Sequence, residues 1–221
     1  MSPVSLDDLM VMLADQVARH PGPRVIVALD GPDGAGKTTM ADALGERLPG
    51  NVLRASVDGF HLSREHRLRR GSLSPEGYYR DSFDYDALRR LLLEPFSSGQ
   101  HEVVVRTFDF RNETGTPPEL IHVEDDAILV FDGVFLLRPE LRNIWDLSIY
   151  LHVEPDVTLG RARARDLGLF GSEAEVERRY GQRYIPGQAL YREEADPMGV
   201  ASVVIDNTKP AAPLVLYPPS N

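Results

Sequence analysis

The sequence contains no cysteine, and this absence excludes several chemistries at once. Without a thiol the chain can form no disulfide, supply no thiolate nucleophile and build no cysteine-ligated metal site. It also lacks any apolar run approaching the roughly 20 residues that a membrane-spanning helix needs. Residues 1–8 lack the basic start and apolar stretch of a secretory signal peptide. We therefore expect a cytoplasmic protein without a membrane partner.

Positive charge is also scarce. The chain has 24 Lys and Arg residues against 34 Asp and Glu residues, which gives a formal net charge of −10. Such a chain has no general basic field for a nucleic-acid backbone, so we expect no nucleic-acid partner. A small phosphorylated ligand needs only a local pocket and is not excluded. Lysine itself occurs only at Lys37 and Lys209.

Short apolar runs alternate with segments of helical spacing along the chain. Runs that are rich in Val and Ile and bounded by Pro or Gly are typical of buried parallel strands. They predict strands over residues 24–29, 51–57, 102–108, 127–131, 147–153 and 201–205. Helical spacing predicts helices over residues 5–19, 37–48, 84–95, 155–166 and 173–183. The alternation predicts an α/β fold with a mostly parallel sheet and helices on both faces.

Two segments fall outside this alternation. Residues 59–82 are polar and rich in Arg, Gly and Tyr, and a long insert of this kind is typical of functional loops. Residues 210–221 are rich in proline, and we expect a loosely held tail there. No repeat or linker divides the chain, so residues 1–221 are expected to form a single domain.

A glycine-rich segment follows the first predicted strand and precedes a predicted helix. Residues 31–38 read Gly-Pro-Asp-Gly-Ala-Gly-Lys-Thr, the pattern of a phosphate-binding loop (P-loop). Glycines let backbone N–H groups approach phosphate oxygens, and the helix N-terminus adds positive potential. The Lys37 ammonium would reach the β- and γ-phosphates of ATP, and the Thr38 hydroxyl would bind Mg²⁺. The residues expected to contact the nucleotide are Gly31, Asp33, Gly34, Ala35, Gly36, Lys37, Thr38 and Thr39.

This motif in this position predicts the three-layer sandwich of P-loop NTPases, with a mostly parallel five-stranded sheet. In such sheets ligands bind beyond the carboxyl ends of the strands. Asp58 and Asp132 each end a predicted strand, so both should face one crevice. Asp132 closes an apolar run like that of a Walker B motif. Asp58 could accept the proton of an attacking hydroxyl or hold the metal through water, and the predicted metal set is Thr38, Asp58 and Asp132.

Several motifs, taken in order, resemble the uridine kinase / phosphoribulokinase family. They are the P-loop, Ser-Val-Asp-Gly-Phe at 56–60, Phe-Asp-Phe at 108–110, Phe-Asp-Gly at 131–133 and the segment 156–166. The resemblance implies a kinase that transfers the γ-phosphate of ATP, with Mg²⁺, to a hydroxyl of a small molecule. It implies that Asp58 is the catalytic base and that residues 161–183 form a helical lid. Arg161 and Arg165 of this lid would meet the charge of the transferring phosphate, together with Lys37. Family members often form dimers or tetramers, so a homo-oligomer is compatible with the resemblance.

The sequence also departs from the family's pattern. The family's Glu-Gly motif is Asp132-Gly133 here, and the segment after Asp109 lacks the family's His-x-Arg. Tyr78 stands where the family carries an Asp for ribose hydroxyls. A uridine kinase-like nucleoside kinase is therefore the first hypothesis. A kinase for a non-nucleoside hydroxyl compound, such as pantothenate, a sugar or a sugar phosphate, is the alternative.

The acceptor is expected to contact the insert and the segment around residues 108–113. The predicted contacts are Phe60, His61, Tyr78, Tyr79, Asp109 and Arg111. The basic residues Arg64, Arg67, Arg69 and Arg70 form either a solvated loop or a surface that attracts an anionic acceptor.

The P-loop by itself would also suit three other classes of protein. A GTPase-type switch would require an Asn-Lys-x-Asp motif, and Asn207-Thr208-Lys209-Pro210 does not match it. A transporter or motor ATPase would require a signature motif, which Ser97-Ser98-Gly99-Gln100 matches only superficially. A nucleotide-binding protein without transfer activity would have no need of Asp58, Asp132 and Arg165, all of which are present.

Overall fold

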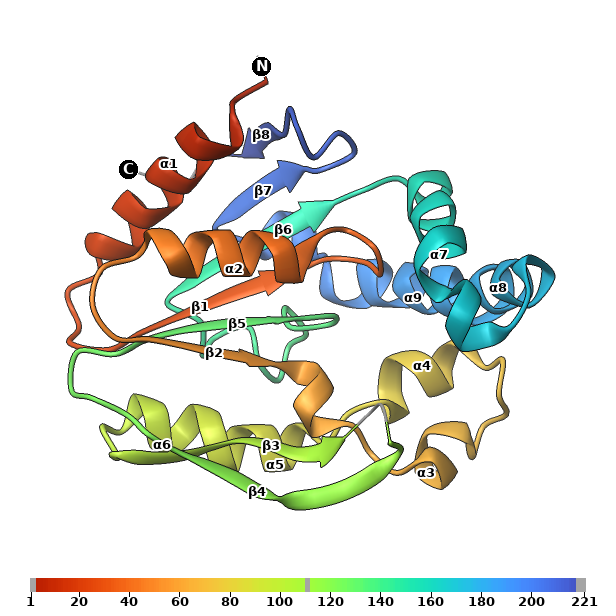
Figure 1. Ribbon diagram of the computed structural model, residues 1–221, viewed down its shortest axis with the longest axis horizontal. Coiled ribbons are helices and arrows are strands. Elements are labelled where there is room, and N and C mark those ends of the chain that lie inside the picture. Colours follow the sequence, from red (N-terminus) through yellow and green to blue (C-terminus); the bar gives the residue numbers. More distant parts are fainter. Residues whose placement is uncertain (1–2, 110–111, 218–221) are drawn as a thin grey trace.

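A six-stranded sheet lies at the centre of the protein (Figure 1). The computed structural model describes residues 3–109 and 112–217. The strands lie in the order β2 (Val52–Ser56), β5 (Ile128–Gly133), β1 (Val25–Asp30), β6 (Leu147–His152), β7 (Val203–Asp206) and β8 (Leu214–Tyr217). All neighbouring pairs are parallel except β7 and β8. The predicted mostly parallel sheet is confirmed, with one antiparallel strand added at its edge.

Strand β1 shows why the fold has three layers. All its residues are buried, and alternate side chains point to opposite faces of a strand. Val27 belongs to the core that β1 forms with helices α1 (Leu6–Ala18) and α2 (Lys37–Arg47). Ala28 belongs to the core on the other face. The helices that contribute to this second core are α4 (Pro75–Asp81), α5 (Tyr85–Leu88), η2 (Arg89–Leu93), α6 (Glu94–Ser97) and α9 (Ile185–Ala195).

Strand β3 (Glu102–Asp109) differs from the prediction. It lies outside the main sheet and pairs antiparallel with β4 (Thr114–His122), a strand that the sequence did not predict. Strand β4 is mostly exposed and contains two adjacent prolines, so its sequence lacks the apolar pattern by which strands are recognised. A short connection suits an antiparallel hairpin, whereas a parallel pair would need a long crossover.

The predicted loose tail is wrong for residues 214–217. They form β8, which pairs with β7, because the apolar side chains of Leu214, Val215 and Leu216 continue the edge of the sheet. The rest of the tail, residues 218–221, lies outside the described residues.

The insert and the lid are both largely helical and lie beyond the carboxyl ends of the central strands (Figure 1). The insert and the residues directly before it form η1 (Val57–Phe60), α3 (Arg64–Leu68) and α4. The lid segment is built from α7 (Pro155–Phe170), α8 (Glu173–Arg179) and η3 (Tyr180–Tyr184), followed by α9 and the short α10 (Pro197–Val200). None of the helices within residues 3–109 and 112–217 has the length and apolar character needed to cross a lipid bilayer.

Gly133, the last residue of β5, provides a test of this packing. A Cβ atom there would lie 2.4 Å from Cγ1 and 2.7 Å from Cβ of the buried Val57. We expect Gly133→Ala to lower the free energy of unfolding by about 1–3 kcal/mol, because the core must shift to accept the methyl group. Gly160→Ala is the control, since no atom lies within 4 Å of that Cβ on helix α7. The control should be neutral or stabilising in denaturant unfolding, and equal effects for both variants would contradict the packing.

Candidate active site

The glycine-rich loop joins β1 to α2 in the conformation of a phosphate cradle. Gly34 and Gly36 have φ angles of 71° and 89°, which glycine adopts without steric cost. Carbonyl groups of the loop are held by side chains. Lys37 Nζ donates to Pro32 O at 2.8 Å, and Asn207 Nδ2 donates to Ala35 O at 2.7 Å. With its carbonyls bound in this way, such a loop can turn N–H groups toward an anion at the start of α2.

Arg161 of the lid helix α7 is bound to backbone carbonyls in and beside the phosphate loop. Its Nη1 donates to Gly34 O at 2.8 Å, and its Nη2 donates to the carbonyls of Asn207 (2.8 Å) and Thr208 (3.1 Å). The guanidinium therefore joins the lid helix α7 to the phosphate loop and to the segment after β7. These contacts place Arg161 at the carbonyls of the phosphate loop, and a contact with the transferring phosphate stays a prediction.

Asp30 is a buried acidic residue that the sequence reasoning missed. Its Oδ1 accepts from Gly31 N at 2.6 Å, and its Oδ2 accepts from Leu137 N at 3.1 Å and from the Tyr191 hydroxyl. Burial raises the pKa of this carboxyl to about 6, although these donors and Lys37 oppose the rise. The only signal in the sequence is an acidic residue that ends an apolar strand directly before the glycine loop.

Thr38 and Asp132 meet as the motifs predicted. Thr38 Oγ1 donates to Asp132 Oδ2 at 2.8 Å, and the carboxylate is almost fully buried. Arg54, which sequence reasoning also missed, donates to Asp132 Oδ1 at 2.9 Å and to the carbonyl of Val130. Arg54 lies on β2, the neighbour of β5, and so it fixes the orientation of the carboxylate.

These groups fit Mg²⁺. A hydroxyl and a carboxylate are hard oxygen ligands, and nucleotide-bound Mg²⁺ needs only one or two carboxylates besides phosphate oxygens and water. In the described part of the chain, no three His, Cys, Asp or Glu side chains lie close enough together to hold a metal ion by themselves. Binding of Mg²⁺ at Thr38 and Asp132 would therefore also need phosphate oxygens of the nucleotide.

Asp58 lies in η1, directly after β2 and immediately before the insert. Its side chain keeps 67% of its surface open, but it lies in a cleft whose walls limit its solvation. This desolvation raises the pKa of Asp58 to about 6, with Lys37 opposing the rise and Asp132 adding to it. At neutral pH the carboxylate is ionised and can accept a proton.

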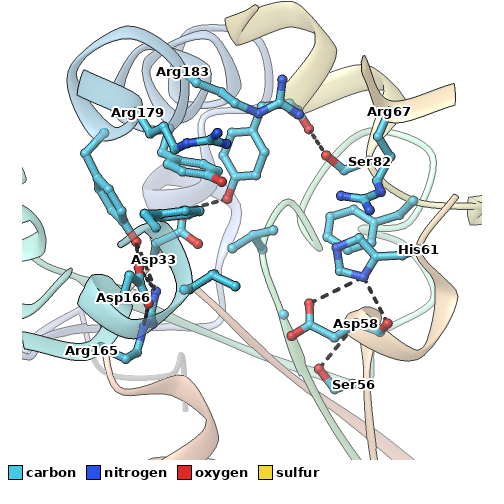
Figure 2. Close-up of a pocket in the computed structure, with 18 of the residues that line it drawn as sticks. Asp33, Ser56, Asp58, His61, Arg67, Ser82, Arg165, Asp166, Arg179 and Arg183 are labelled. Atoms are coloured by element: carbon cyan, nitrogen blue, oxygen red, sulfur yellow. Dashed lines mark hydrogen bonds and ion pairs between the residues drawn. The ribbon is translucent and has the colours of Figure 1, made fainter. Parts of the chain in front are cut away.

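The cleft has a volume of about 470 Å³ and lies between the phosphate loop, the insert and the lid (Figure 2). It brings together many of the predicted residues. Those that line it are Asp33, Lys37, Thr38, Asp58, His61, Tyr78, Asp132 and Arg165. Residues from segments far apart in the sequence therefore share one space. The other predicted nucleotide contacts, Gly31, Gly34, Ala35, Gly36 and Thr39, belong to the same loop and the first turn of α2.

Phe60 and Tyr79 do not lie in this cleft, contrary to the prediction. Phe60 is fully buried and Tyr79 nearly so, and both belong to the core beneath the insert. The Tyr79 ring packs edge-on against Phe135, with the Arg138 guanidinium 5.1 Å from its centroid. Aromatic side chains in a polar segment suggested substrate contacts, but here they anchor that segment to the core.

His61 and Tyr78 are placed as candidate acceptor contacts. His61 Nδ1 lies 2.9 Å from the Asp58 carbonyl, and burial lowers the pKa of this imidazole to about 4. The ring is therefore neutral, and because a carbonyl can only accept, Nδ1 carries the proton. The Tyr78 hydroxyl donates to Asp33 Oδ2 at 2.6 Å. This hydrogen bond connects the insert to the phosphate loop.

The remaining predicted residues lie elsewhere or are engaged locally. Asp109 accepts from the backbone N–H and the side-chain amide of Asn112, at 3.1 and 2.7 Å, in the turn after β3. Arg111 lies outside the described residues. Arg165 donates to both carboxylate oxygens of Asp166, at 2.6 and 2.9 Å, while its side chain remains half exposed at the cleft.

A comparison with family models settles the relationship. The model of the phosphoribulokinase / uridine kinase family matches residues 26–176, more than half of the chain. The chain belongs to this family. Its members named among the curated relatives are kinases, and the chain is a P-loop kinase of this family in both sequence and fold.

Individual relatives of this kinase are distant. It is 28% identical over 152 residues to a uridine kinase of Schizosaccharomyces pombe, a match that covers 66% of this chain and 33% of that protein. It is 26% identical over 158 residues to a uridine kinase of Geobacillus sp. strain WCH70, covering 68% of this chain and 71% of that one. The match thus spans only a third of the Schizosaccharomyces pombe protein.

Solved structures confirm the P-loop kinase fold. A possible uridine kinase from Bacillus stearothermophilus superposes with a TM-score of 0.70 at 23% identity, covering 90% of this chain and 98% of that one. A D-glycerate 3-kinase from Cryptococcus neoformans superposes with a TM-score of 0.64 at 14% identity, covering 96% and 99%. At these identities the likeness concerns the fold alone.

The burial of Asp30 in this kinase predicts a pH dependence of stability. The folded protein holds this proton up to a pKa of about 6, whereas the unfolded chain releases it near 3.8. The stability that the folded protein gains by holding this proton is therefore complete below about pH 4. It is lost as the pH rises through about 6, which lowers the free energy of unfolding by at most about 3 kcal/mol. Denaturant unfolding of wild type and Asp30→Asn between about pH 4 and pH 7 measures this loss of stability.

The stability difference, wild type minus Asp30→Asn, should fall as the pH rises. Asp58 titrates in the same range but is present in both proteins, so its contribution cancels in this difference. A difference that stays constant with pH would contradict the raised pKa of Asp30.

Proposed function

We propose that this P-loop kinase transfers the γ-phosphate of Mg-ATP to a hydroxyl group of a small molecule. The observation that carries the proposal is the convergence of Lys37, the Thr38–Asp132 pair and Asp58 on one cleft. A nucleotide-binding loop alone would support only binding. A carboxylate with a pKa of about 6, lining the same cleft as Thr38 and Asp132, supports transfer.

In the proposed reaction the phosphate loop binds the triphosphate, and Lys37 offsets the negative charge of its outer phosphates. Asp58 orients the acceptor hydroxyl and takes its proton as the oxygen attacks. Thr38 and Asp132 would hold Mg²⁺, which when bound neutralises charge on the phosphate oxygens. Most of the rate enhancement comes from positioning and charge stabilisation, because phosphoryl transfer leaves little covalent chemistry to the protein.

The lid contributes exclusion of water and further positive charge. Arg165 lies at the cleft on α7, and a rearrangement of its pair with Asp166 would turn the guanidinium toward the transferring phosphate. Closure of such a lid suppresses hydrolysis of ATP by water. For the acceptor, a nucleoside of the uridine type is the first candidate, supported by the uridine kinases among the relatives. A non-nucleoside acceptor is the second, supported by the departures at Tyr78 and after Asp109.

Product formation from Mg-ATP tests this proposal. The acceptor panel contains uridine, cytidine, other nucleosides, pantothenate, ribulose 5-phosphate, glycerate and simple sugars, and phosphorylated products are identified by mass spectrometry. We expect one chemical class to give a product, with little ATP hydrolysis when no acceptor is present. ATP hydrolysis that no acceptor changes, without any phosphorylated product, would contradict the kinase assignment.

Replacement of the candidate base tests its role separately. Asp58→Asn should lower kcat by about 10²–10⁴-fold, the usual range for loss of a positioned general base. ATP binding, measured by calorimetry, should change little because the phosphate loop is intact. Asp15→Asn on the exposed surface of α1 makes the same change in net charge and is the control. Unchanged turnover in Asp58→Asn would refute the base assignment.

A further inference from the structure

Arg183 is a buried cation at the cleft, and no acidic side chain of residues 3–109 and 112–217 pairs with it. It lies in η3, lines the cleft and is only 4% exposed. Its Nη1 donates to the carbonyl of Ser74 at 3.2 Å, and its guanidinium carbon lies 5.7 Å from the centroid of the Tyr78 ring. Among the residues that the structure describes, no carboxylate lies within ion-pair distance of it. A buried charge without a counter-charge is costly, so its presence requires an explanation.

The other arginines that line the cleft show how unusual a buried guanidinium without an acidic partner is. Arg165 pairs with Asp166 at 2.6 Å, Arg179 pairs with Glu175 at 2.7 Å, and Arg67 pairs with Glu113. Arg64, the other arginine at the cleft, is exposed, and there water supplies the solvation that Arg183 lacks. Burial lowers the pKa of Arg183, and the charges of Arg67 and Arg179 add to that effect.

A turn of π-helix in the backbone places Arg183 at the cleft. Residues Tyr180–Tyr184 form one turn of π-helix between α8 and α9. Such turns cost hydrogen-bond geometry and often occur at functional sites, where they redirect side chains. Tyr180, Arg183 and Tyr184 of this one turn all line the cleft.

The surroundings of Arg183 are suited to an anion. Arg183 enters from the lid side, while Arg67 and Ser82 come from the insert on the facing side (Figure 2). Asp33 of the phosphate loop and Asp166 of α7 also line the cleft, but both are already engaged. Asp33 accepts from the Tyr78 hydroxyl, and Asp166 accepts from Arg165 and from the Tyr180 hydroxyl. An incoming carboxylate or phosphate would therefore meet the guanidinium of Arg183, which no acidic side chain among the described residues offsets.

We propose that Arg183 binds an anionic group, a carboxylate or a phosphate ester, on the molecule whose hydroxyl is phosphorylated. The inference rests on the proposed kinase function and narrows its acceptor. A guanidinium can hold two oxygens of such a group at once, which fixes the orientation of a small molecule as well as its charge. A neutral nucleoside would leave the buried charge of Arg183 without compensation.

Matched pairs of acceptors test the proposal. Glycerate with glycerol, pantothenate with pantothenyl alcohol, and fructose 1-phosphate with fructose are pairs in which the members differ in one anionic group. We expect kcat/KM to be at least about tenfold higher for the anionic member of the pair that reacts, since a charge-assisted hydrogen bond is worth about that factor. A reaction of the glycerate or pantothenate pair would identify the anionic group as a carboxylate. A reaction of the fructose pair would identify it as a phosphate ester. Preference for a neutral acceptor would overturn the inference and leave the kinase function standing.

Variants of Arg183 test the residue itself. Arg183→Met should raise KM for the anionic acceptor by about 10–100-fold with a smaller effect on KM for ATP, and should bring the anionic and neutral members of a pair close together. Arg183→Lys, which keeps a charge but loses the second donor group, should fall between wild type and Arg183→Met. Arg178→Met is the control, because Arg178 lies on the same helical segment, is paired with Glu175 and is half exposed. An unchanged KM in Arg183→Met would overturn the proposal.

Binding without turnover keeps the inference testable if the kinase function fails or Arg183→Met does not fold. A non-hydrolysable ATP analogue with Mg²⁺ fills the phosphate loop, and inorganic phosphate and 3-phosphoglycerate are then titrated with calorimetry. Wild type should bind at least one of them about tenfold or more tightly than Arg183→Lys or Arg183→Gln. Equal binding by all three proteins overturns the anion site, whatever the activity.

Discussion

The hydrogen bonds of the buried Asp30 carboxylate hold together the parts of the protein on which the active site depends. Through Gly31 this group fixes the start of the phosphate loop, through Leu137 it fixes the segment after β5, and through Tyr191 it fixes helix α9. These segments are far apart in the sequence but meet at the end of one strand. A charged group at this point is costly to bury, and its donors and the nearby Lys37 reduce that cost. The floor of the cleft is therefore tied together by hydrogen bonds of one buried group, and the insert and the lid lie above it.

The phosphate loop is shaped by residues outside it as much as by its glycines. Arg161 of the lid helix and Asn207 after β7 hold the carbonyls of Gly34 and Ala35. Arg54 of β2 similarly holds Asp132 of β5, which in turn receives the Thr38 hydroxyl. Each of these supporting residues belongs to an element adjacent to the one that carries the functional group. Positioning in this site is thus a property of neighbouring strands and helices rather than of the motif alone.

The sequence predicted what depends on local pattern. The alternation of apolar runs indicated the parallel sheet, and the spacing of Gly34, Gly36 and Lys37 indicated the loop before α2. It could not predict the pairing of β3 with β4, because the exposed, proline-containing β4 has no apolar pattern. It misplaced Phe60 and Tyr79, because the sequence alone does not show whether an aromatic side chain in a polar insert faces a ligand or the core. Arg54 and Arg183 were missed because their importance depends on which carboxylates lie near them, and that is known only once the chain has folded.

The hydrogen bond between Tyr78 and Asp33 has a consequence for how the two ligands of the cleft bind. It joins helix α4 to the phosphate loop, which in the proposed reaction lie on the acceptor side and the nucleotide side of the cleft. Any ligand that shifts one of these partners must either carry the other along or break a buried contact. The two halves of the cleft are then thermodynamically linked, and by reciprocity each ligand changes the affinity for the other by the same factor. In the proposed kinase, this one phenol would therefore couple the binding of ATP to the binding of the acceptor.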